Sequence, residues 1–440
     1  MTPQAPPRRS LVHHPDFRLL WAGDAAGQLG AQLTGLVLPI YAVSQLHATE
    51  WQMGALSAAE TAAFLVIGLP AGAWVDRMRK RRTLVVADVA RAVVLGAVVV
   101  TALAGHGSMG LLLVAAAAIS VASVFFDVAH QSYVPGLVGL DHVVEGNAKL
   151  QATQSVALVA APALGGALLR VVSAPVIMIG TVGTYTLSAL LLGRIRAAET
   201  LPARADRRPL REEIAEGLRF VLHQPLLRRI VACTSIGNLF HTAAGALTVI
   251  YALRVLGMDE AGLGLVMSAS AVGGLAGAFL AERVARLVGE ARVIPVSAVA
   301  FGLAFLATPL ALPLADVVPP EVTLVAGGAV FSFFVVVYNV AQVSFRQRLC
   351  PPALLGRMNA SVRFLVWGSM PLGGLLGGWL GTTIGVVPTL WVAAAGGVAS
   401  AVPVVLSPLV RLTRLPTPDD QLGSGPEGEP EDQAEGTVRR

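Results

Sequence analysis

The stretch GLPAGAWVDRMRKRR, residues 68–82, sets an apolar run directly against one acid and five bases. The chain around it has 440 residues, of which 55% are hydrophobic and only 13% charged, whereas a soluble protein usually carries about 25% charged residues. So little polar surface cannot cover so large an apolar core in water. We therefore expect that lipid surrounds most of the chain and that residues 68–82 mark the end of a membrane span.

Apolar runs long enough to cross a bilayer, which takes roughly 20 residues, recur along the whole chain. They predict an all-α membrane protein with twelve spans at 18–46, 51–75, 83–104, 110–134, 145–170, 174–194, 229–254, 260–282, 292–313, 322–345, 357–384 and 386–409. The one long hydrophilic interruption, about 195–228, contains LREEIAEGLRFVLHQPLLRR. This pattern is typical of an amphipathic helix at the membrane surface.

The distribution of bases predicts the orientation of the spans. The connections after spans 2 and 6 hold five and nine Lys or Arg residues, whereas the odd-numbered connections hold only Arg170 and Arg254. Because basic loops stay in the cytoplasm, we expect a multi-pass inner (cytoplasmic) membrane protein with both termini inside. The predicted units are a cytoplasmic segment (1–17), a six-helix bundle (18–194), a cytoplasmic linker (195–228), a second six-helix bundle (229–409) and a disordered cytoplasmic tail (410–440).

The two predicted bundles are related in sequence. A shift of 212 residues places polar and aromatic positions of the first bundle on similar positions of the second, namely Asp127 on Asn339, Ser132 on Ser344, Tyr133 on Phe345 and Asn147 on Asn359. The same shift aligns Gly165-Gly166 with Gly377-Gly378. We infer two parallel six-span repeats.

Two six-span repeats joined by a long central loop resemble the major facilitator superfamily. Residues 72–81, GAWVDRMRKR, resemble its signature between spans 2 and 3, although Arg79 stands where glycine is usual. The stretches HPDFRLLWAGD at 14–24, FFDVAHQSYVPGLV at 125–138 and NVAQVSFRQRLCPPALLGRMNASVRFLVWGSMPLGGLLGG at 339–378 resemble the twelve-span branch that exports drugs, macrolides and siderophores. The resemblance implies a secondary transporter whose halves rock about a central site.

The signature residues also have a physical interpretation. Inside-positive charge accounts for the bases Arg77 and Arg81, but not for the acid Asp76 among them. A carboxylate here could dock against the positive end of a neighbouring helix, so we interpret Gly72, Asp76, Arg77 and Arg81 as parts of a gate.

A second motif lies in span 5, where APALGG at 161–166 resembles an antiporter motif of the superfamily with alanine in place of its first glycine. Pro162 removes a backbone hydrogen bond, and Gly165 and Gly166 admit a close neighbour. Proton antiport and ordinary tight packing are both compatible with this pattern.

Polar side chains within spans are functional candidates, because an ionisable group at mid-bilayer costs about 3 kcal/mol. Glu60 in span 2 and Asp24 in span 1 are our candidates for proton coupling, with hydrogen-bonded packing of Glu60 and hydration of Asp24 as the alternatives. Candidates that line a substrate cavity lie on polar stripes of spans 1, 7 and 10: Gln28, Gln32, Asn238, His241 and Asn339. We assign Asp127, Arg91 and Arg363 to a charge network near the cytoplasmic face, structural or gating. Asp88 lies three residues before Arg91, and this i, i+3 spacing indicates a local ion pair. Span 4 lacks the arginine that many proton antiporters of the superfamily carry there.

These features favour proton-driven efflux of a lipophilic small molecule over the alternatives we considered. A charged metabolite such as a siderophore, exported or imported, would need opposite charge at the cavity centre, and we expect none there.

Neither lysine, Lys80 or Lys149, belongs to a GxxxxGK[ST] phosphate loop, and the chain has no HExxH or GxSxG element. We therefore expect no enzyme, no cofactor beyond the proton gradient, no metal site and no nucleic-acid partner. A membrane scaffold or sensor is disfavoured by the paired polar faces. We expect a monomer.

Overall fold

A computed structural model describes residues 11–139, 142–197, 199, 210–351 and 354–412, and all regular elements among them are helices. The first half contains η1 (Leu11–His13), α1 (Pro15–Ser44), α2 (Glu50–Val66), α3 (Gly68–Asp76), α4 (Lys80–Leu103), α5 (Met109–Val138), α6 (Val143–Leu169) and α7 (Ala174–Gly193). The linker helix α8 (Leu210–His223) precedes the second half, which contains α9 (Pro225–Ile250), η4 (Tyr251–Val255), α10 (Glu260–Val288), α11 (Val293–Phe305), α12 (Ala307–Leu310), α13 (Pro320–Leu349), α14 (Leu355–Trp367), α15 (Ser369–Ile384), α16 (Val386–Ala399), α17 (Val402–Val405) and η6 (Pro408–Val410). The tail predicted to be disordered lies almost wholly outside the described residues.

The helices reproduce the predicted spans. Ten helical segments in the described part of the chain are long and apolar enough to cross a membrane. The two remaining spans are each divided between two helices, α2 with α3 and α14 with α15, which meet at Ile67 and Gly368. The expected all-α fold with twelve spans is confirmed, and the two breaks are an addition that hydropathy did not reveal.

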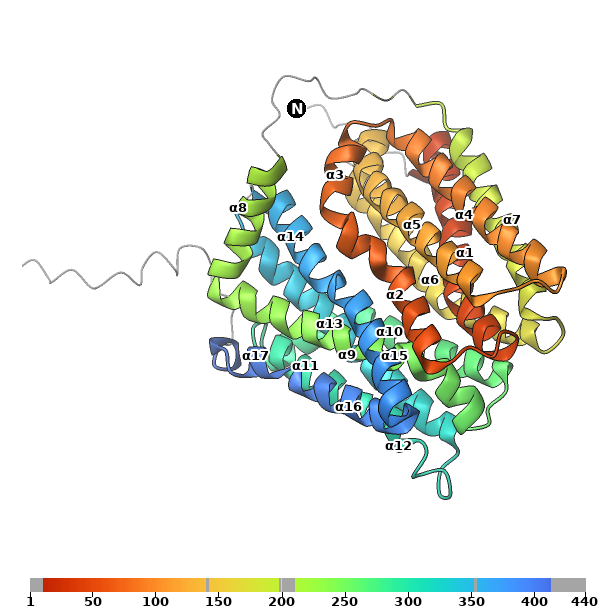
Figure 1. Ribbon diagram of the computed structural model, residues 1–440. Coiled ribbons are helices and arrows are strands. Elements are labelled where there is room, and N and C mark those ends of the chain that lie inside the picture. Colours follow the sequence, from red (N-terminus) through yellow and green to blue (C-terminus); the bar gives the residue numbers. More distant parts are fainter. Residues whose placement is uncertain (1–10, 140–141, 198, 200–209, 352–353, 413–440) are drawn as a thin grey trace, which may run out of the picture.

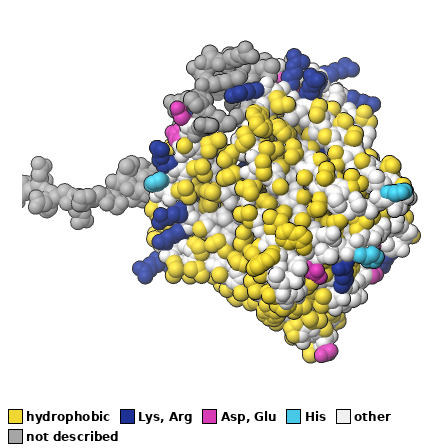
Figure 2. Space-filling model, in the orientation of Figure 1, with side chains coloured by type: hydrophobic (Ala, Val, Ile, Leu, Met, Phe, Trp, Pro, Cys, Tyr) yellow, Lys and Arg dark blue, Asp and Glu magenta, His cyan; other side chains and the backbone are white. Residues whose placement is uncertain are grey.

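The two halves lie side by side, with α1–α7 on one side and α9–α17 on the other (Figure 1). We call the end that holds residues 77–82 and α8 the basic end, and the end that holds the connections α1–α2 and η4–α10 the opposite end. Figure 2 shows most of the visible Lys and Arg side chains in two groups, one near the α3–α4 connection and one that begins near α8, with others beside acidic and histidine side chains at the opposite end. Between the two groups the visible surface is mostly apolar.

The outward faces of the helices are apolar, as a bilayer requires. Val86, Val93 and Val100 on α4 are 58%, 65% and 68% exposed, and Phe279 on α10 is 86% exposed. In water such a surface would cause aggregation. In a bilayer it is the side of the protein that faces the lipid. The chain is a multi-pass membrane protein.

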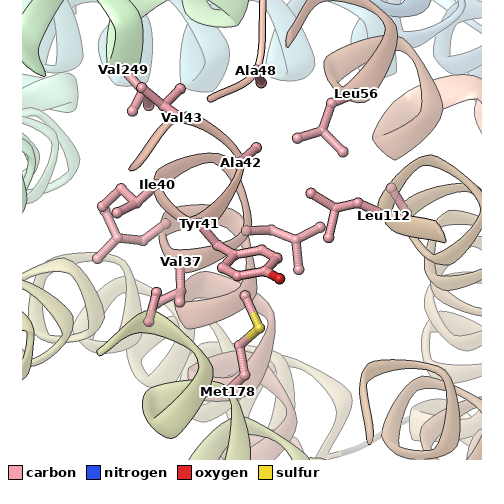
Figure 3. Packing of buried hydrophobic residues seen from close by; sticks show 14 of the residues in the cluster. Val37, Ile40, Tyr41, Ala42, Val43, Ala48, Leu56, Leu112, Met178 and Val249 are labelled. Atoms are coloured by element: carbon pink, nitrogen blue, oxygen red, sulfur yellow. The ribbon is translucent and has the colours of Figure 1, made fainter. Parts of the chain in front are cut away.

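An apolar core closes the opposite end of the molecule. The last turns of α1 lie at its centre, where Val43 faces Val249 of α9, and Leu56, Leu112 and Met178 surround them (Figure 3). Because Val249 belongs to the second half, this core joins the halves as well as the helices of the first half.

The linker helix differs from the expectation. We expected α8 to lie on the membrane surface, but its apolar face packs against α14: Val221 is fully buried in a cluster with Met358 and Val362. A side chain at Gly217 would meet the backbone of Arg357 at 2.6 Å. The apolar face of α8 is therefore covered by protein rather than by lipid, because α14 presents an apolar face to it at the basic end.

Candidate functional site

A cavity of about 500 Å³ lies between the two halves at the basic end. Its walls come from α2, α3 and α5 of the first half and from α8 and α14, and they include Phe64, Gly72, Val124, Gln131, Arg363 and Phe364. Ligand pockets for small molecules have volumes of about 300–1,000 Å³, so the cavity is of a suitable size for a small-molecule cargo. A side chain at Gly72 would meet nothing within 4 Å, so this glycine keeps the cavity wall open rather than allowing a close helix contact.

Arg363 crosses this cavity from α14. Its Nη1 donates to Oε1 of Gln131 on α5 at 3.0 Å, and its guanidinium lies 4.5 Å from the ring centroid of Trp367. Trp367 in turn meets Phe64 of α2 edge to face, with 4.6 Å between ring centroids. Arg363, which we assigned to a charge network near the cytoplasmic face, therefore also lines this cavity together with Arg357.

At the opposite end the halves are held together by close helix crossings. Gly54 of α2 lies against Gly378 of α15, and a Cβ at Gly54 would come within 2.5 Å of the Gly378 Cα. A Cβ at Gly166 of α6 would come within 2.9 Å of the Cα of Gly264 in α10. Each crossing pairs one helix of the first half with one of the second, and only glycine permits this backbone approach.

The span 5 motif takes part in this closure. Gly166 forms the crossing with α10, while a side chain at Gly165 would meet Leu36 of α1 at 2.6 Å. Pro162 lies within α6 one turn away, and its carbonyl oxygen approaches Gly264. All three residues thus take part in helix packing in this structure. Their predicted role in antiport stays a prediction.

Two polar links add to the closure at the opposite end. Arg254 of η4 donates from Nη2 to the carbonyl oxygen of Val43 at 3.1 Å. The hydroxyl of Ser44 donates to Oε1 of Glu260 at the start of α10. Both links join the first half to the second.

A cluster of ionisable side chains is buried inside the first half. Nη1 of Arg91 donates to Oδ1 of Asp88 at 2.9 Å, and the two side chains are 5% and 0% exposed. Nε2 of His130 lies 3.4 Å from Oδ1 of Asp24, which is almost completely buried. The guanidinium of Arg91 also faces Phe126, with 4.6 Å to the ring centroid. The cluster draws on α1, α4 and α5, and the local Asp88–Arg91 pair that the i, i+3 spacing indicates is present.

This cluster is incompletely hydrogen-bonded. Asp24 Oδ1, Asp88 Oδ2, Arg91 Nε and His130 Nε2 are buried without a hydrogen-bond partner. Buried polar atoms without a hydrogen-bond partner are rare in folded proteins. Arg91 lies 11 residues from the first residue of α4, Lys80, which corresponds to about 16 Å along the helix. Its assignment to a charge network with Asp127 and Arg363 stays a prediction.

Two further acids predicted within the spans, Glu60 and Asp127, lie on α2 and α5. Glu60 is partly buried and lies about 15 Å along α2 from Glu50, near the middle of a hydrocarbon core of about 30 Å. The described residues provide it with no ion pair. Asp127 on α5 is within electrostatic range of Arg91, His130 and, across the cavity, Arg363. Asp127 thus connects the buried cluster of the first half with the second half.

Three of the five cavity candidates line one space, but inside the second half. Asn238, His241 and Asn339 border a cavity of about 130 Å³. His241 stacks on Phe331 with 4.8 Å between ring centroids, and the amide of Asn238 donates to the carbonyl oxygen of Val366 at 3.1 Å. The cavity is too small for a drug-sized ligand. Gln28 and Gln32 are partly exposed on α1, and the cavities described here are lined by other residues.

The basic segment between α3 and α4 is fixed in place by hydrogen bonds to Glu199, a residue that our sequence analysis did not single out. Glu199, from the linker, accepts hydrogen bonds from the backbone amides of Lys80 at 2.6 Å and Arg81 at 2.7 Å, and so caps α4. The guanidinium of Arg81 donates to the carbonyl oxygen of Ile195. Arg77 is exposed at the end of α3. The side chain of Asp76 lies outside the described part of the structure, so its predicted role stays a prediction. Glu199 carries no periodic or motif signal, because its partner amides are more than a hundred residues away.

Among the described residues, no group of three or more His, Cys, Asp or Glu side chains is placed to hold a metal ion. The two cysteines, Cys233 and Cys350, are buried and unpaired.

Comparison with known proteins places these features in a family. A family model described as transmembrane secretion effector matches residues 5–425. The multidrug efflux pump Tap of Mycolicibacterium fortuitum is 26% identical over 389 residues, which cover 85% of this chain and 91% of Tap. The enterobactin exporter EntS of Salmonella typhimurium is 27% identical over 361 residues, covering 79% of this chain and 81% of EntS.

Solved structures share the fold. The nucleoside transporter NupG has a TM-score of 0.68 at 14% identity, covering 89% of this chain and 98% of NupG. A bacterial homologue of the iron transporter ferroportin, in an inward-facing state, has a TM-score of 0.70 at 17% identity, covering 90% of this chain and 99% of that protein. Since the family model spans nearly the whole sequence and the fold agrees, the chain belongs to the transmembrane secretion effector family of the major facilitator superfamily.

Proposed function

We propose that this protein exports a lipophilic small molecule across the membrane by alternating access. The observation that carries the proposal is the cavity of about 500 Å³ between the halves at the basic end, opposite an end that is closed by the Gly54–Gly378 and Gly166–Gly264 crossings. A cargo would enter from the basic end and leave after the crossings at the opposite end separate. The names of the relatives Tap and EntS, a drug efflux pump and a siderophore exporter, support this direction.

We further propose that the basic end faces the cytoplasm of a bacterial cell, with the protein in the inner membrane and both termini inside. The support is the concentration of Lys and Arg at this end, since basic segments near membrane spans are retained in the cytoplasm. The protein would act as a monomer, since both halves that alternating access requires belong to this one chain, and as a transporter rather than an enzyme.

Proton influx is the proposed energy source. Glu60 lies near mid-bilayer without a described ion pair, and Asp24 is buried beside His130 in the first half. Ionisable groups so placed are typical of proton pathways in transporters. Asp127 provides a route by which a change of charge in this cluster would reach Arg363 across the cavity.

A polar anionic cargo is a second candidate, because Arg363 lines the cavity and hydrogen-bonds only the neutral Gln131 among the described side chains. Arg357 contributes less, since its guanidinium contacts Glu216 at 2.5 Å. An anionic siderophore such as a catecholate would have the matching charge, and EntS is by its name an exporter of enterobactin.

Flux into inverted membrane vesicles distinguishes these candidates. With a proton gradient, acidic inside, vesicles containing the protein should accumulate a lipophilic dye such as ethidium faster than vesicles without it. An uncoupler should abolish the difference. If the cargo is anionic, Arg363→Gln should reduce transport of a catecholate more strongly than transport of the dye, whereas a lipophilic cargo predicts no such difference between the two. Equal fluxes with and without the protein, for both classes, would refute export.

A further inference from the structure

A groove on the outer surface of the first half is separate from the transport cavity. It has a volume of about 710 Å³, and we call it the α4–α5 groove. Its walls are almost entirely apolar and mostly small: Met78, Thr83, Val86, Ala87, Ala90, Ala118, Val121, Ala122 and Phe125, with Arg79 and Arg82 at its basic end. A neighbouring face of α5 lines the transport cavity through Val124 and Gln131, and the two spaces have no lining residue in common.

The groove faces the lipid. Val86 and Val121 in its walls are 58% and 41% exposed. Along α4 the exposed face continues through Val89 and Val93 towards the opposite end. A large apolar surface that is open to the bilayer is filled by acyl chains, because no water is available there.

A cationic pocket adjoins the groove at its basic end. This second space, of about 520 Å³, is lined by Arg79, Arg81, Arg82, Val85, Gly193, Arg196, Ala197 and Glu199. Arg79 and Arg82 therefore line both spaces. The one carboxylate of the pocket, that of Glu199, is engaged by the backbone amides of Lys80 and Arg81.

A second carboxylate lies beside this pocket and, like that of Glu199, is engaged by a backbone amide: Oδ1 of Asp16 accepts from the amide of Arg196 at 3.2 Å. The side chains of Arg79, Arg82 and Arg196 are exposed, and none of them forms an ion pair with a carboxylate of the described residues. Figure 2 shows Lys and Arg side chains gathered near the α3–α4 connection, beside an apolar face. A cationic pocket beside an apolar groove matches the two parts of an amphiphile with an anionic head.

The dimensions fit a phospholipid of one leaflet. From Arg79 to Ala90 the groove follows about 11 residues of α4, or about 16 Å. Half of a hydrocarbon core of about 30 Å is about 15 Å. An acyl chain in the groove would therefore end near mid-bilayer while its phosphate lies at Arg79 and Arg82.

We propose that the α4–α5 groove and the adjoining cationic pocket form a binding site for an anionic phospholipid of the leaflet at the basic end. The phosphate is bound by Arg79, Arg82 and Arg196, and one acyl chain fills the groove. Arginine suits this role because its planar guanidinium can donate two hydrogen bonds to a phosphate. The bound lipid bridges the α3–α4 connection and the first linker residues after α7.

Quenching of Trp74 by brominated lipids tests the site. Trp74 stacks on Phe125, a groove residue, with 6.1 Å between ring centroids. In a variant whose other five tryptophans are phenylalanine, reconstituted in phosphatidylcholine vesicles, brominated phosphatidylglycerol should quench Trp74 at a lower mole fraction than brominated phosphatidylcholine. Each arginine near an anionic lipid surface contributes a factor of about five, so Arg79→Gln with Arg82→Gln should remove most of this preference.

The matched control is Arg283→Gln with Arg286→Gln, two exposed arginines at the basic end of α10, which should leave the preference unchanged. If the single-tryptophan protein does not fold, retention of phosphatidylglycerol by the wild-type and double-variant proteins in native mass spectrometry provides the same comparison. Equal affinity for both lipids, or a preference that survives the Arg79 and Arg82 substitutions, would overturn the proposal. Displacement by inorganic phosphate alone, without an effect of Ala118→Phe in the groove wall, would indicate a simple anion site and would also overturn it.

Discussion

The Arg91 guanidinium and the Asp88 carboxylate illustrate how a membrane protein can hold charge in its interior. Each alone would cost several kcal/mol to bury, but together they form a pair of 2.9 Å that is further covered by the Phe126 ring. Because Asp88 already neutralises Arg91, the neighbouring Asp24 has the amide of Gln28 and the imidazole of His130 beside it. The fixed Asp88–Arg91 pair is thus distinct from the more loosely paired Asp24 and His130, which are the groups available for proton exchange under the proposed coupling.

Removal of one partner of the fixed pair should be costly. We expect Arg91→Met to lower the free energy of unfolding by about 3 kcal/mol, since it leaves the Asp88 carboxylate buried and unpaired. The double variant with Asp88→Leu should recover most of that loss, and thermal unfolding in detergent measures both. If the double variant were as unstable as the single one, packing around Arg91 rather than its charge would account for the effect.

Glu60 should be required for coupling but not for folding. We expect Glu60→Gln to abolish proton-driven flux in inverted vesicles, because the amide cannot take up or release a proton, while the protein elutes normally from size-exclusion chromatography. Glu282→Gln, at an exposed site on α10, is the matched control and should transport normally. Transport by Glu60→Gln with the wild-type dependence on pH would exclude Glu60 from coupling.

The glycine crossings act at the level of whole helices. Gly54 and Gly166 allow α2 and α6 to lie against α15 and α10 at backbone distance, so these contacts can form and separate as units without interlocking side chains. The division of the second and eleventh spans at Ile67 and Gly368 places a joint in both helices that face each other across the cavity.

A side chain at a crossing should keep the opposite end from closing. We expect Gly54→Val to abolish transport, because its Cβ would overlap the Gly378 backbone, while expression stays near the wild-type level. Gly96→Val on α4 is the control, since a Cβ there meets nothing within 4 Å. Labelling of a cysteine at position 44 by a membrane-impermeant reagent should increase in Gly54→Val only. Normal transport by this variant would show that the crossing is dispensable.

Sequence predicted those elements whose signals are local. Hydropathy identified all twelve spans, and the i, i+3 spacing identified the Asp88–Arg91 pair. Contacts between distant segments could not be predicted: the capping of α4 by Glu199, the docking of α8 on α14 and the entry of Arg363 into the cavity each depend on tertiary packing. Likewise, the sequence revealed the polar stripes on spans 7 and 10. It did not reveal that Asn238, His241 and Asn339 border one small cavity inside the second half.

At the scale of the whole molecule, the structure represents one of the two conformations that alternating access requires. The halves are joined at the opposite end by an apolar core, two glycine crossings and the links from Arg254 and Ser44. At the basic end they are separated by a cavity that few contacts cross, chiefly the Arg363–Gln131 hydrogen bond. Export requires the reverse arrangement, in which the crossings separate and the cavity walls meet.

Distances between spin labels at the two ends measure this exchange directly. In a background with Cys233 and Cys350 replaced by serine, one label pair at positions 78 and 286 reports on the basic end and another at 106 and 317 on the opposite end; the residues at these sites are exposed. We predict that addition of a transported compound, or a change of pH, shortens the first distance while it lengthens the second. Distances that stay fixed, or that change in the same direction at both ends while transport proceeds, would contradict alternating access by rocking halves.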